Sequence, residues 1–215
     1  MDRKSQAGVA RYAPGIAAMP AEKRRFVATT DSSHAFGRYP NLIKDIEIDG
    51  LDQVWISDIT YVRLPTTFCY LAAILDAYSR RCLGWHLSRQ IDTRRSLSAL
   101  EMALAARRPA VGLIHHSDQG VQYASSEYVL RLEEAGALLS MAAVGNPYQN
   151  AQAESFFRTL KLEEVYLKDY HNFKEAEENV GLFIEEVYNE KRLHSSLGYL
   201  PPVEFEALHA LKAGS

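Results

Sequence analysis

Cysteines and long apolar stretches are both scarce in this sequence. Only two cysteines occur among 215 residues, and both Cys69 and Cys82 have apolar, strand-like surroundings. They are expected to be small buried side chains in a reducing compartment, since a disulfide or a zinc site finds little support. No run of about eighteen apolar residues occurs, and residues 1–18 lack the apolar core of a signal peptide. These absences predict a cytoplasmic protein without a membrane partner.

A strong surplus of positive charge is missing as well. The formal net charge is −3 at pH 7, which taken alone argues against nucleic-acid binding. The charges are unevenly spread, however: basic residues predominate in 1–45 and 60–95, and acidic residues in 163–190. A DNA-binding face needs a local basic stripe and not a basic chain. Charge alone therefore leaves DNA binding and ordinary solvated surfaces equally open.

The hydrophobic pattern divides the chain into two parts. Residues 1–50 show little periodicity and contain Pro14, Pro20 and Pro40, which predicts a basic, partly disordered lead-in. Residues 51–208 alternate between β-rich and helical segments, which predicts one α/β domain that ends in a helical tail.

The predicted elements follow the order β-β-β-α-β-α-β-α-α. Short turns join the first three strands, which favours an antiparallel meander, and the two later strands suit a buried parallel arrangement. The strands are expected at residues 53–62, 68–75, 82–87, 111–115 and 138–141. The helices are expected from Thr93 onward, from Ser125 to about Glu134, and over 151–167 and 173–191. This order predicts a mixed sheet with helices on its faces.

Three acidic residues occupy positions that suit metal binding. Asp58 interrupts an apolar strand, where a carboxylate is unfavourable unless a cation or hydrogen-bond donors satisfy it. Asp118 directly follows the fourth strand, at the end where open α/β sheets place ligands. Glu154 lies near the start of a helix. Three converging carboxylates would supply the oxygen ligands that Mg²⁺ or Mn²⁺ prefers, and a pair of such ions suits phosphoryl displacement.

Each of the three residues also has an ordinary structural explanation. Asp58 can be a satisfied buried group or an edge residue, and Asp118 can be a turn residue before Gly120. Glu154 can favour the dipole of its helix. Taken singly, none of them is specific for catalysis.

Several motifs together resemble the integrase-core signature of insertion-sequence transposases, of the IS-three group with its second-frame catalytic subunit. The resemblance covers about residues 24–208. The 35 residues 119–153 separate Asp118 from Glu154, a spacing that this group shares with retroviral integrases. The matching motifs are Trp55-x-x-Asp-Ile-Thr-Tyr61, His115-His-Ser-Asp-Gln-Gly-x-Gln-Tyr123, Asn146-Pro-Tyr-x-Asn-Ala151, Glu154-Ser-Phe-Phe-x-Thr-Leu-Lys161 and Tyr188-Asn-x-x-Arg-Leu-His-Ser-Ser-Leu-Gly-Tyr-x-Pro-Pro202.

The resemblance implies a ribonuclease-H-like fold, with three antiparallel strands followed by two parallel strands and flanking helices. It implies that Asp58, Asp118 and Glu154 form a DDE triad that binds two Mg²⁺ or Mn²⁺ ions and catalyses DNA cleavage and strand transfer. The implied partners are transposon ends, target DNA, further copies of the chain, and a separate or fused helix-turn-helix recognition product. A bacterial, nucleoid-associated protein is expected.

The helix that contains Glu154 is expected to bind DNA. Glu154, Arg158 and Lys161 lie at i, i+4 and i+7 and therefore on one helical face, where the two cations suit neighbouring phosphates. A solvated ion pair is the alternative. The residues expected to pack on the sheet from the opposite face are Phe156, Leu160 and Leu167.

Further DNA contacts are expected from Tyr148, Gln149 and Asn150, because amides hydrogen-bond bases or phosphates and a tyrosine ring stacks on an unpaired base. His194 is another candidate. His115 and His116 are expected to orient Asp118 or to contact DNA, with His116 the preferred DNA contact of the two.

This chain departs from the family pattern at two positions. The family usually has Asp at position 149 and often a basic residue at 152, where this chain has Gln149 and Gln152. The expected helix-turn-helix region before the core is also not seen. The sequence therefore leaves three functions open: an active transposase core, a silent truncated remnant that binds DNA or multimerises, and a nuclease that does not join strands.

Overall fold

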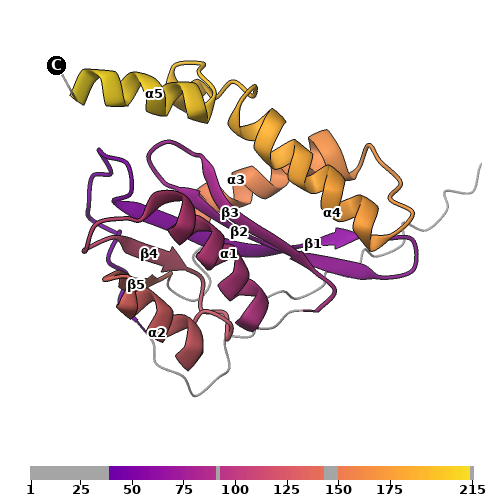
Figure 1. Ribbon diagram of the computed structural model, residues 1–215, viewed down its shortest axis with the longest axis horizontal. Helices are drawn as coiled ribbons and strands as arrows, with labels where there is room; N and C mark the ends of the chain where they lie inside the picture. Colours follow the sequence, from indigo (N-terminus) through magenta and orange to yellow (C-terminus); the bar gives the residue numbers. More distant parts are fainter. Residues whose placement is uncertain (1–38, 91–92, 143–149, 214–215) are drawn as a thin grey trace, which may run out of the picture.

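The computed structural model describes residues 39–90, 93–142 and 150–213, which form a five-stranded mixed sheet flanked by helices (Figure 1). The strand order across the sheet is β3-β2-β1-β4-β5. β1 pairs antiparallel with β2, and β2 pairs antiparallel with β3, whereas β4 is parallel to both β1 and β5. The strands are β1 Val54–Arg63, β2 Phe68–Asp76, β3 Cys82–Ser88, β4 Ile114–Ser117 and β5 Leu138–Met141. The predicted mixed sheet is confirmed.

Helices cover both faces of this sheet. α1 and α2 pack on one face, and α3 and α4 pack on the other (Figure 1). α3 continues into the π-helical turn Lys161–Val165, and α4 continues into a second π-helical segment, Phe183–Asn189. A short 3-10 turn, Ser195–Leu197, precedes the last helix. The α-helices are α1 Thr93–Arg107, α2 Ser126–Glu134, α3 Ala151–Leu160, α4 Phe173–Leu182 and α5 Pro202–Ala213.

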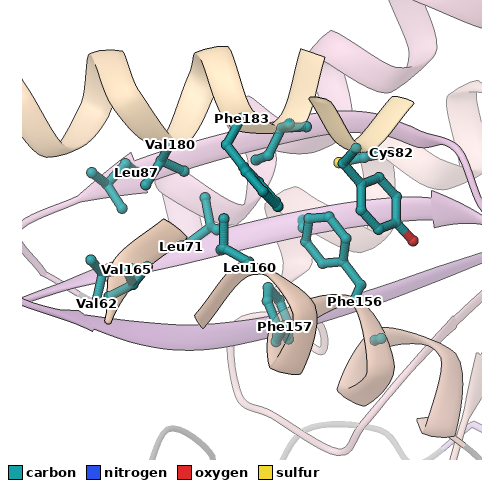
Figure 2. Close-up of a cluster of buried hydrophobic side chains, with 14 of the residues drawn as sticks. Val62, Leu71, Cys82, Leu87, Phe156, Phe157, Leu160, Val165, Val180 and Phe183 are labelled. Atoms are coloured by element: carbon teal, nitrogen blue, oxygen red, sulfur yellow. The ribbon is translucent and has the colours of Figure 1, made fainter. Parts of the chain in front are cut away.

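Strand β1 divides the interior into two hydrophobic cores. Successive side chains of a strand point to opposite faces of the sheet. Val54, Ile56 and Val62 accordingly contact the α3 and α4 side, whereas Trp55 and Ile59 contact the α1 and α2 side. Figure 2 shows the first core, where aromatic and aliphatic side chains of α3 and α4 cover the strands. β1 is the central strand of the sheet, and its two faces contribute side chains to both cores.

Local sequence signals account for the ends of the second helix. The Ser125 hydroxyl accepts a hydrogen bond from the Tyr128 backbone N–H at 3.4 Å, as expected of an N-cap. Gly136 follows the helix with φ at 69°, a conformation that glycine adopts without strain. Both residues were expected to mark these ends, and the structure confirms them.

Two predicted details are wrong. The fourth strand begins at Ile114 and not at position 111, because Val111 is 88% exposed and Gly112 turns the chain with φ at 101°. Leu167 does not pack on the sheet but is 74% exposed, since the helix has already ended at Val165. The last helix, α5, was not among the predicted elements, and both cysteines are buried, as expected. Within the described residues, no helix is long and apolar enough to span a membrane.

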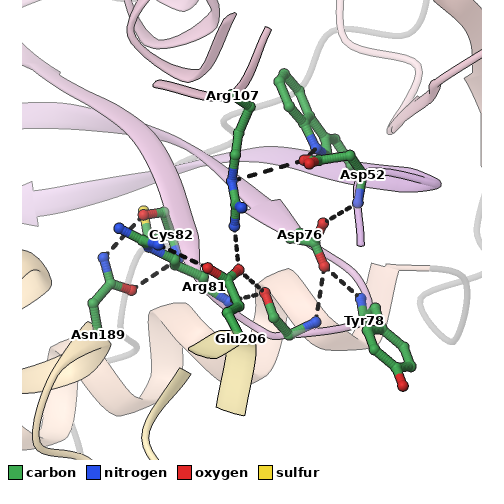
Figure 3. A network of polar contacts seen from close by, with 10 residues as sticks. Asp52, Asp76, Tyr78, Arg81, Cys82, Arg107, Asn189 and Glu206 are labelled. Carbon is green, nitrogen blue, oxygen red and sulfur yellow. Dashed lines mark hydrogen bonds and ion pairs between the residues drawn. The ribbon is translucent and has the colours of Figure 1, made fainter. Parts of the chain in front are cut away.

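A polar network attaches α5 to the rest of the domain (Figure 3). The Glu206 carboxylate, which is only 7% exposed, accepts hydrogen bonds from the Ser79 hydroxyl at 2.6 Å and from Arg81 at 2.7 Å. It also pairs with Arg107 of α1. In the adjoining turn, Asp76 accepts hydrogen bonds from backbone N–H groups, including that of Ser79 at 2.8 Å. One buried carboxylate therefore joins α5, the β2–β3 turn and α1.

Glu206→Gln is expected to lower the free energy of unfolding by about 2–3 kcal/mol, because Arg81 would lose its anionic partner and Arg107 would keep only Asp52 in a partly buried position. Urea denaturation measures this change. Glu204→Gln, an exposed substitution on the same helix, is the matched control and is expected to change stability by less than about 0.5 kcal/mol. Equal losses in the two variants would contradict a stabilising role for the network.

Candidate active site

Asp58 lies within β1, and Asp118 directly follows the neighbouring parallel strand β4. The last residue pair of β1 and β4 joins Ser57 to Ser117, and the two aspartates directly follow these serines. Parallel neighbours in register extend side by side in the same direction. The sheet therefore brings together two carboxylates that are far apart in the sequence.

Backbone donors hold both carboxylates. The Ile59 N–H donates to Asp58 Oδ1 at 2.7 Å, and the Gly120 N–H donates to Asp118 Oδ1 at 2.9 Å. Both side chains are half-buried. These bonds fix one oxygen of each group, and Asp58 also lines a pocket between β1 and α3.

Glu154 lines the same pocket from α3. It lies exposed in the first turn of α3, whose buried residues Phe156, Phe157 and Leu160 pack against the sheet. The pocket has a volume of about 430 Å³, and Asp58 and Glu154 both line it. Packing of α3 on β1 thus sets the position of the third acidic residue.

The electrostatics of Asp58 indicate that the three acids lie near one another. Burial raises the pKa of Asp58 to about 8, and the negative charges of Asp118 and Glu154 add to this increase. The Ile59 N–H and the Lys161 ammonium act in the opposite direction. A buried carboxyl beside two further acids is a site where a cation would relieve unfavourable charge.

Oxygen donors and negative charge fit a hard divalent cation. In the part of the chain that the structure describes, however, no three His, Cys, Asp or Glu side chains are already grouped closely enough to hold a metal ion. The structure thus shows three acids within electrostatic range, and not a finished coordination cage.

Comparison with known families identifies two overlapping matches. Residues 50–147 match the model of an integrase core domain, and residues 135–202 match a second integrase core domain model. The chain is 39% identical over 194 residues to an uncharacterised 31 kDa protein of insertion element IS600 from Shigella sonnei, a match that spans 89% of this chain and 71% of that protein. The chain belongs to the insertion-sequence transposases that contain an integrase core.

Other transposases of this kind are similar over shorter shares of their own length. The IS904 transposase of Lactococcus lactis is 39% identical over 78% of this chain and 66% of the relative. Transposase InsF of insertion sequence IS3A from Escherichia coli is 35% identical over 85% of this chain and 64% of the relative. The chain therefore spans slightly less than two thirds of these two transposases.

Solved structures of retroviral integrases have the same fold. A chain of the simian T-cell lymphotropic virus intasome superposes with a TM-score of 0.60 at 16% identity, covering 82% of this chain and 60% of that chain. The HTLV-2 integrase catalytic core, solved in complex with magnesium, gives a TM-score of 0.55 at 14% identity. The match covers 72% of this chain and 95% of that core. The expected ribonuclease-H-like fold is confirmed.

The two predicted cations lie on the pocket wall together with Glu154. Arg158 is exposed, and Lys161 is half-buried. Lys161 Nζ lies 4.2 Å from the centre of the Tyr61 ring, which itself packs edge-on against Phe68 at 5.5 Å. Tyr61 therefore holds the Lys161 ammonium by a cation–π contact. No role was predicted for this tyrosine, since nothing in a strand pattern shows which helix residue will cover it.

The predicted DNA contact of His116 is not compatible with this structure. The ring is fully buried, and its Nδ1 lies 2.8 Å from the Ser140 hydroxyl of β5. His115 is also buried, and its Nε2 lies 3.0 Å from the Tyr128 hydroxyl. His115 thus joins β4 to α2, and His116 joins β4 to β5 within the sheet. Both rings are buried because both faces of this strand are covered.

The remaining predicted DNA contacts have different outcomes. Tyr148 and Gln149 lie outside the described residues. Asn150 is only 7% exposed and precedes α3 without capping it through its side chain. His194 is half-buried and packs edge-on against Tyr188 at 5.0 Å, and burial is the main cause that lowers the pKa of His194 to about 4.

With a chelator present, Asp58→Asn is expected to stabilise the protein increasingly as the pH rises. The folded protein retains the Asp58 proton up to about pH 8, whereas the unfolded chain releases it near the ordinary value of 3.8. Ionisation therefore opposes folding across this window, and an asparagine avoids a penalty on the order of a few kcal/mol. Thermal melts from pH 4 to pH 9 measure the effect.

Asp169→Asn, an exposed substitution, is the control for this pH series. The difference in melting temperature between Asp169→Asn and the unmodified protein should not increase with pH. If the difference in melting temperature between Asp58→Asn and the unmodified protein stayed constant with pH, it would contradict a raised pKa of Asp58.

Proposed function

We propose that this chain is the catalytic core of a DDE-type polynucleotidyl transferase that cleaves DNA at transposon ends and joins them to target DNA. One observation supports this function above the others: Asp58 and Asp118 directly follow Ser57 and Ser117, the last paired residues of β1 and β4, and α3 presents Glu154 to the pocket that Asp58 lines. The family supports transposition in general, and the arrangement of the acids supports the DDE chemistry.

Asp58, Asp118 and Glu154 are the residues that would hold Mg²⁺ or Mn²⁺, with two ions expected. When bound, such ions supply electrostatic stabilisation of the charge that develops on phosphate oxygens. The similar HTLV-2 integrase core is described as a complex with magnesium. The fit rests here on the donor chemistry and on the raised pKa of Asp58.

The cationic side chains of α3 position the DNA in this proposal. Arg158 lies one helical turn beyond Glu154, and Lys161 lies about two turns beyond it, so their charges follow the pocket wall. They bind backbone phosphates and place a phosphodiester bond beside the carboxylates. Hydrolysis of that bond by water leaves a 3′-hydroxyl, which then displaces a phosphodiester oxygen of the target strand. Positioning and charge neutralisation account for most of the catalysis.

The larger assembly is part of the same proposal. Residues 51–208 form the catalytic core with its helical tail, and residues 1–50 precede it as a basic lead-in. The partners are transposon ends, target DNA, further copies of this chain, and a separate or fused helix-turn-helix product that selects the ends. A DNA-binding protein without catalysis is the competing function.

Glu154→Gln is expected to reduce metal-dependent DNA nicking and joining by about a hundred-fold or more, because it removes one anionic ligand at the reacting phosphate. DNA binding should persist or tighten, since a negative charge near phosphates is lost. Labelled terminal-repeat DNA with Mn²⁺ measures both activities. Glu127→Gln is the matched control, because Glu127 is likewise exposed in the first turn of its helix, α2.

The outcomes of this assay separate the competing functions. Loss of activity in Glu154→Gln but not in Glu127→Gln supports the transferase. DNA binding by the unmodified chain without nicking would identify the remnant, and nicking without joining would identify a nuclease. Equal activity of Glu154→Gln and the unmodified chain would remove Glu154 from the site.

A further inference from the structure

The pocket beside Asp58 extends beyond the acidic residues, along the end of α3 and its π-helical turn. Asp58 and Glu154 line one part of it, and Leu162 and Tyr166 line another. Its volume of about 430 Å³ lies within the range of about 300–1,000 Å³ that is usual for small-ligand sites. The pocket can therefore accept a chemical group in addition to the phosphodiester at the carboxylates.

Leu162 and Tyr166 give this second part an apolar wall. Leu162 is 52% exposed, and Tyr166 is 64% exposed. The Tyr166 backbone N–H donates to the Lys161 carbonyl at 2.9 Å, which fixes the start of the tyrosine side chain. Single exposed apolar residues are ordinary on protein surfaces, so exposure alone indicates no ligand. The neighbouring charged side chains indicate which class of ligand the pocket can bind.

Two cations share the pocket with the tyrosine ring. Lys161 is held against Tyr61 at 4.2 Å, and Arg158 is exposed. Among the residues with described side chains, no carboxylate lies within ion-pairing distance of either cation. Lys161 interacts with Asp58 only at longer range, and both cations can therefore bind an external anion. An aromatic face next to such cations matches the way in which proteins bind single-stranded nucleic acid.

A nucleotide has both of the groups that this pocket can bind. Its phosphate complements Lys161, and the face of its base complements the Tyr166 ring. A base inside a duplex is paired and stacked, so only an unpaired nucleotide can present its face to this wall. We propose that the pocket binds one unpaired nucleotide of the DNA substrate, with its base against Leu162 and Tyr166 and its phosphate beside Lys161. This proposal rests on the proposed function, which supplies DNA as the ligand.

Two DNA probes test the proposal. Both are short duplexes of the same sequence with a single-stranded overhang, and one of them has abasic residues in the overhang. Fluorescence anisotropy with a chelator present, at one fixed salt concentration, gives the Kd of each probe. The unmodified protein is expected to bind the natural overhang about five-fold to a hundred-fold more tightly than the abasic one, as stacking of one base predicts.

Three variants locate the source of this preference. Tyr166→Ala is expected to bind both probes with nearly equal Kd, and Tyr166→Phe is expected to retain the preference because its ring still stacks. Tyr199→Ala is the matched control, since Tyr199 is 69% exposed and is not part of the pocket lining. Thermal melts check that all three variants are folded.

Each outcome supports or overturns the proposal. A preference that disappears only in Tyr166→Ala supports the nucleotide pocket. A preference that persists in Tyr166→Ala, or equal binding of both probes by the unmodified protein, overturns the pocket while DNA binding itself stands. Binding of neither probe overturns the proposed function and the nucleotide pocket together.

Discussion

At the centre of the sheet, β1 and β4 pair in parallel, with Val54 to Ser57 in register with Ile114 to Ser117. This pairing ends where the candidate site begins. Antiparallel pairing would place the two aspartates at opposite ends of the strands, and a register shift of one residue would turn Asp58 to the other face. The backbone hydrogen bonds between these strands therefore determine which acids meet, and the helices only complete the pocket.

Placing like charges together opposes folding, so the surrounding packing must offset the penalty. Phe156, Phe157 and Leu160 of α3 are each no more than 5% exposed, and each contributes about 1.5–3 kcal/mol by leaving water. The side chains that stabilise the domain thus also fix the helix that presents Glu154. The Asp58 carboxyl remains unfavourable in its ionised form within this rigid frame, a condition that suits a cation-binding site.

Much of the fold follows from the sequence because β1 to β3 and the helices have clear periodicity and end signals. The acids were found through their motifs, since each one alone has an ordinary explanation. Other features depend on tertiary contacts. Burial of His116 requires β5 beside it, and the position of Lys161 requires the Tyr61 ring. Sequence spacing shows neither neighbour, so a DNA contact was wrongly predicted for His116 and no role was predicted for Tyr61.

The wrong prediction for Leu167 and the apolar wall of the pocket have one physical cause. Ordinary α-helical spacing places Leu167 seven residues after Leu160, on the buried face. From Lys161 the helix instead forms hydrogen bonds to the fifth residue back, which adds one residue to the turn. Val165, five residues after Leu160, therefore fills the core and is only 6% exposed. Tyr166, the next residue, is left at the pocket, so the same π-helical turn that closes the core also forms the surface proposed to bind a base.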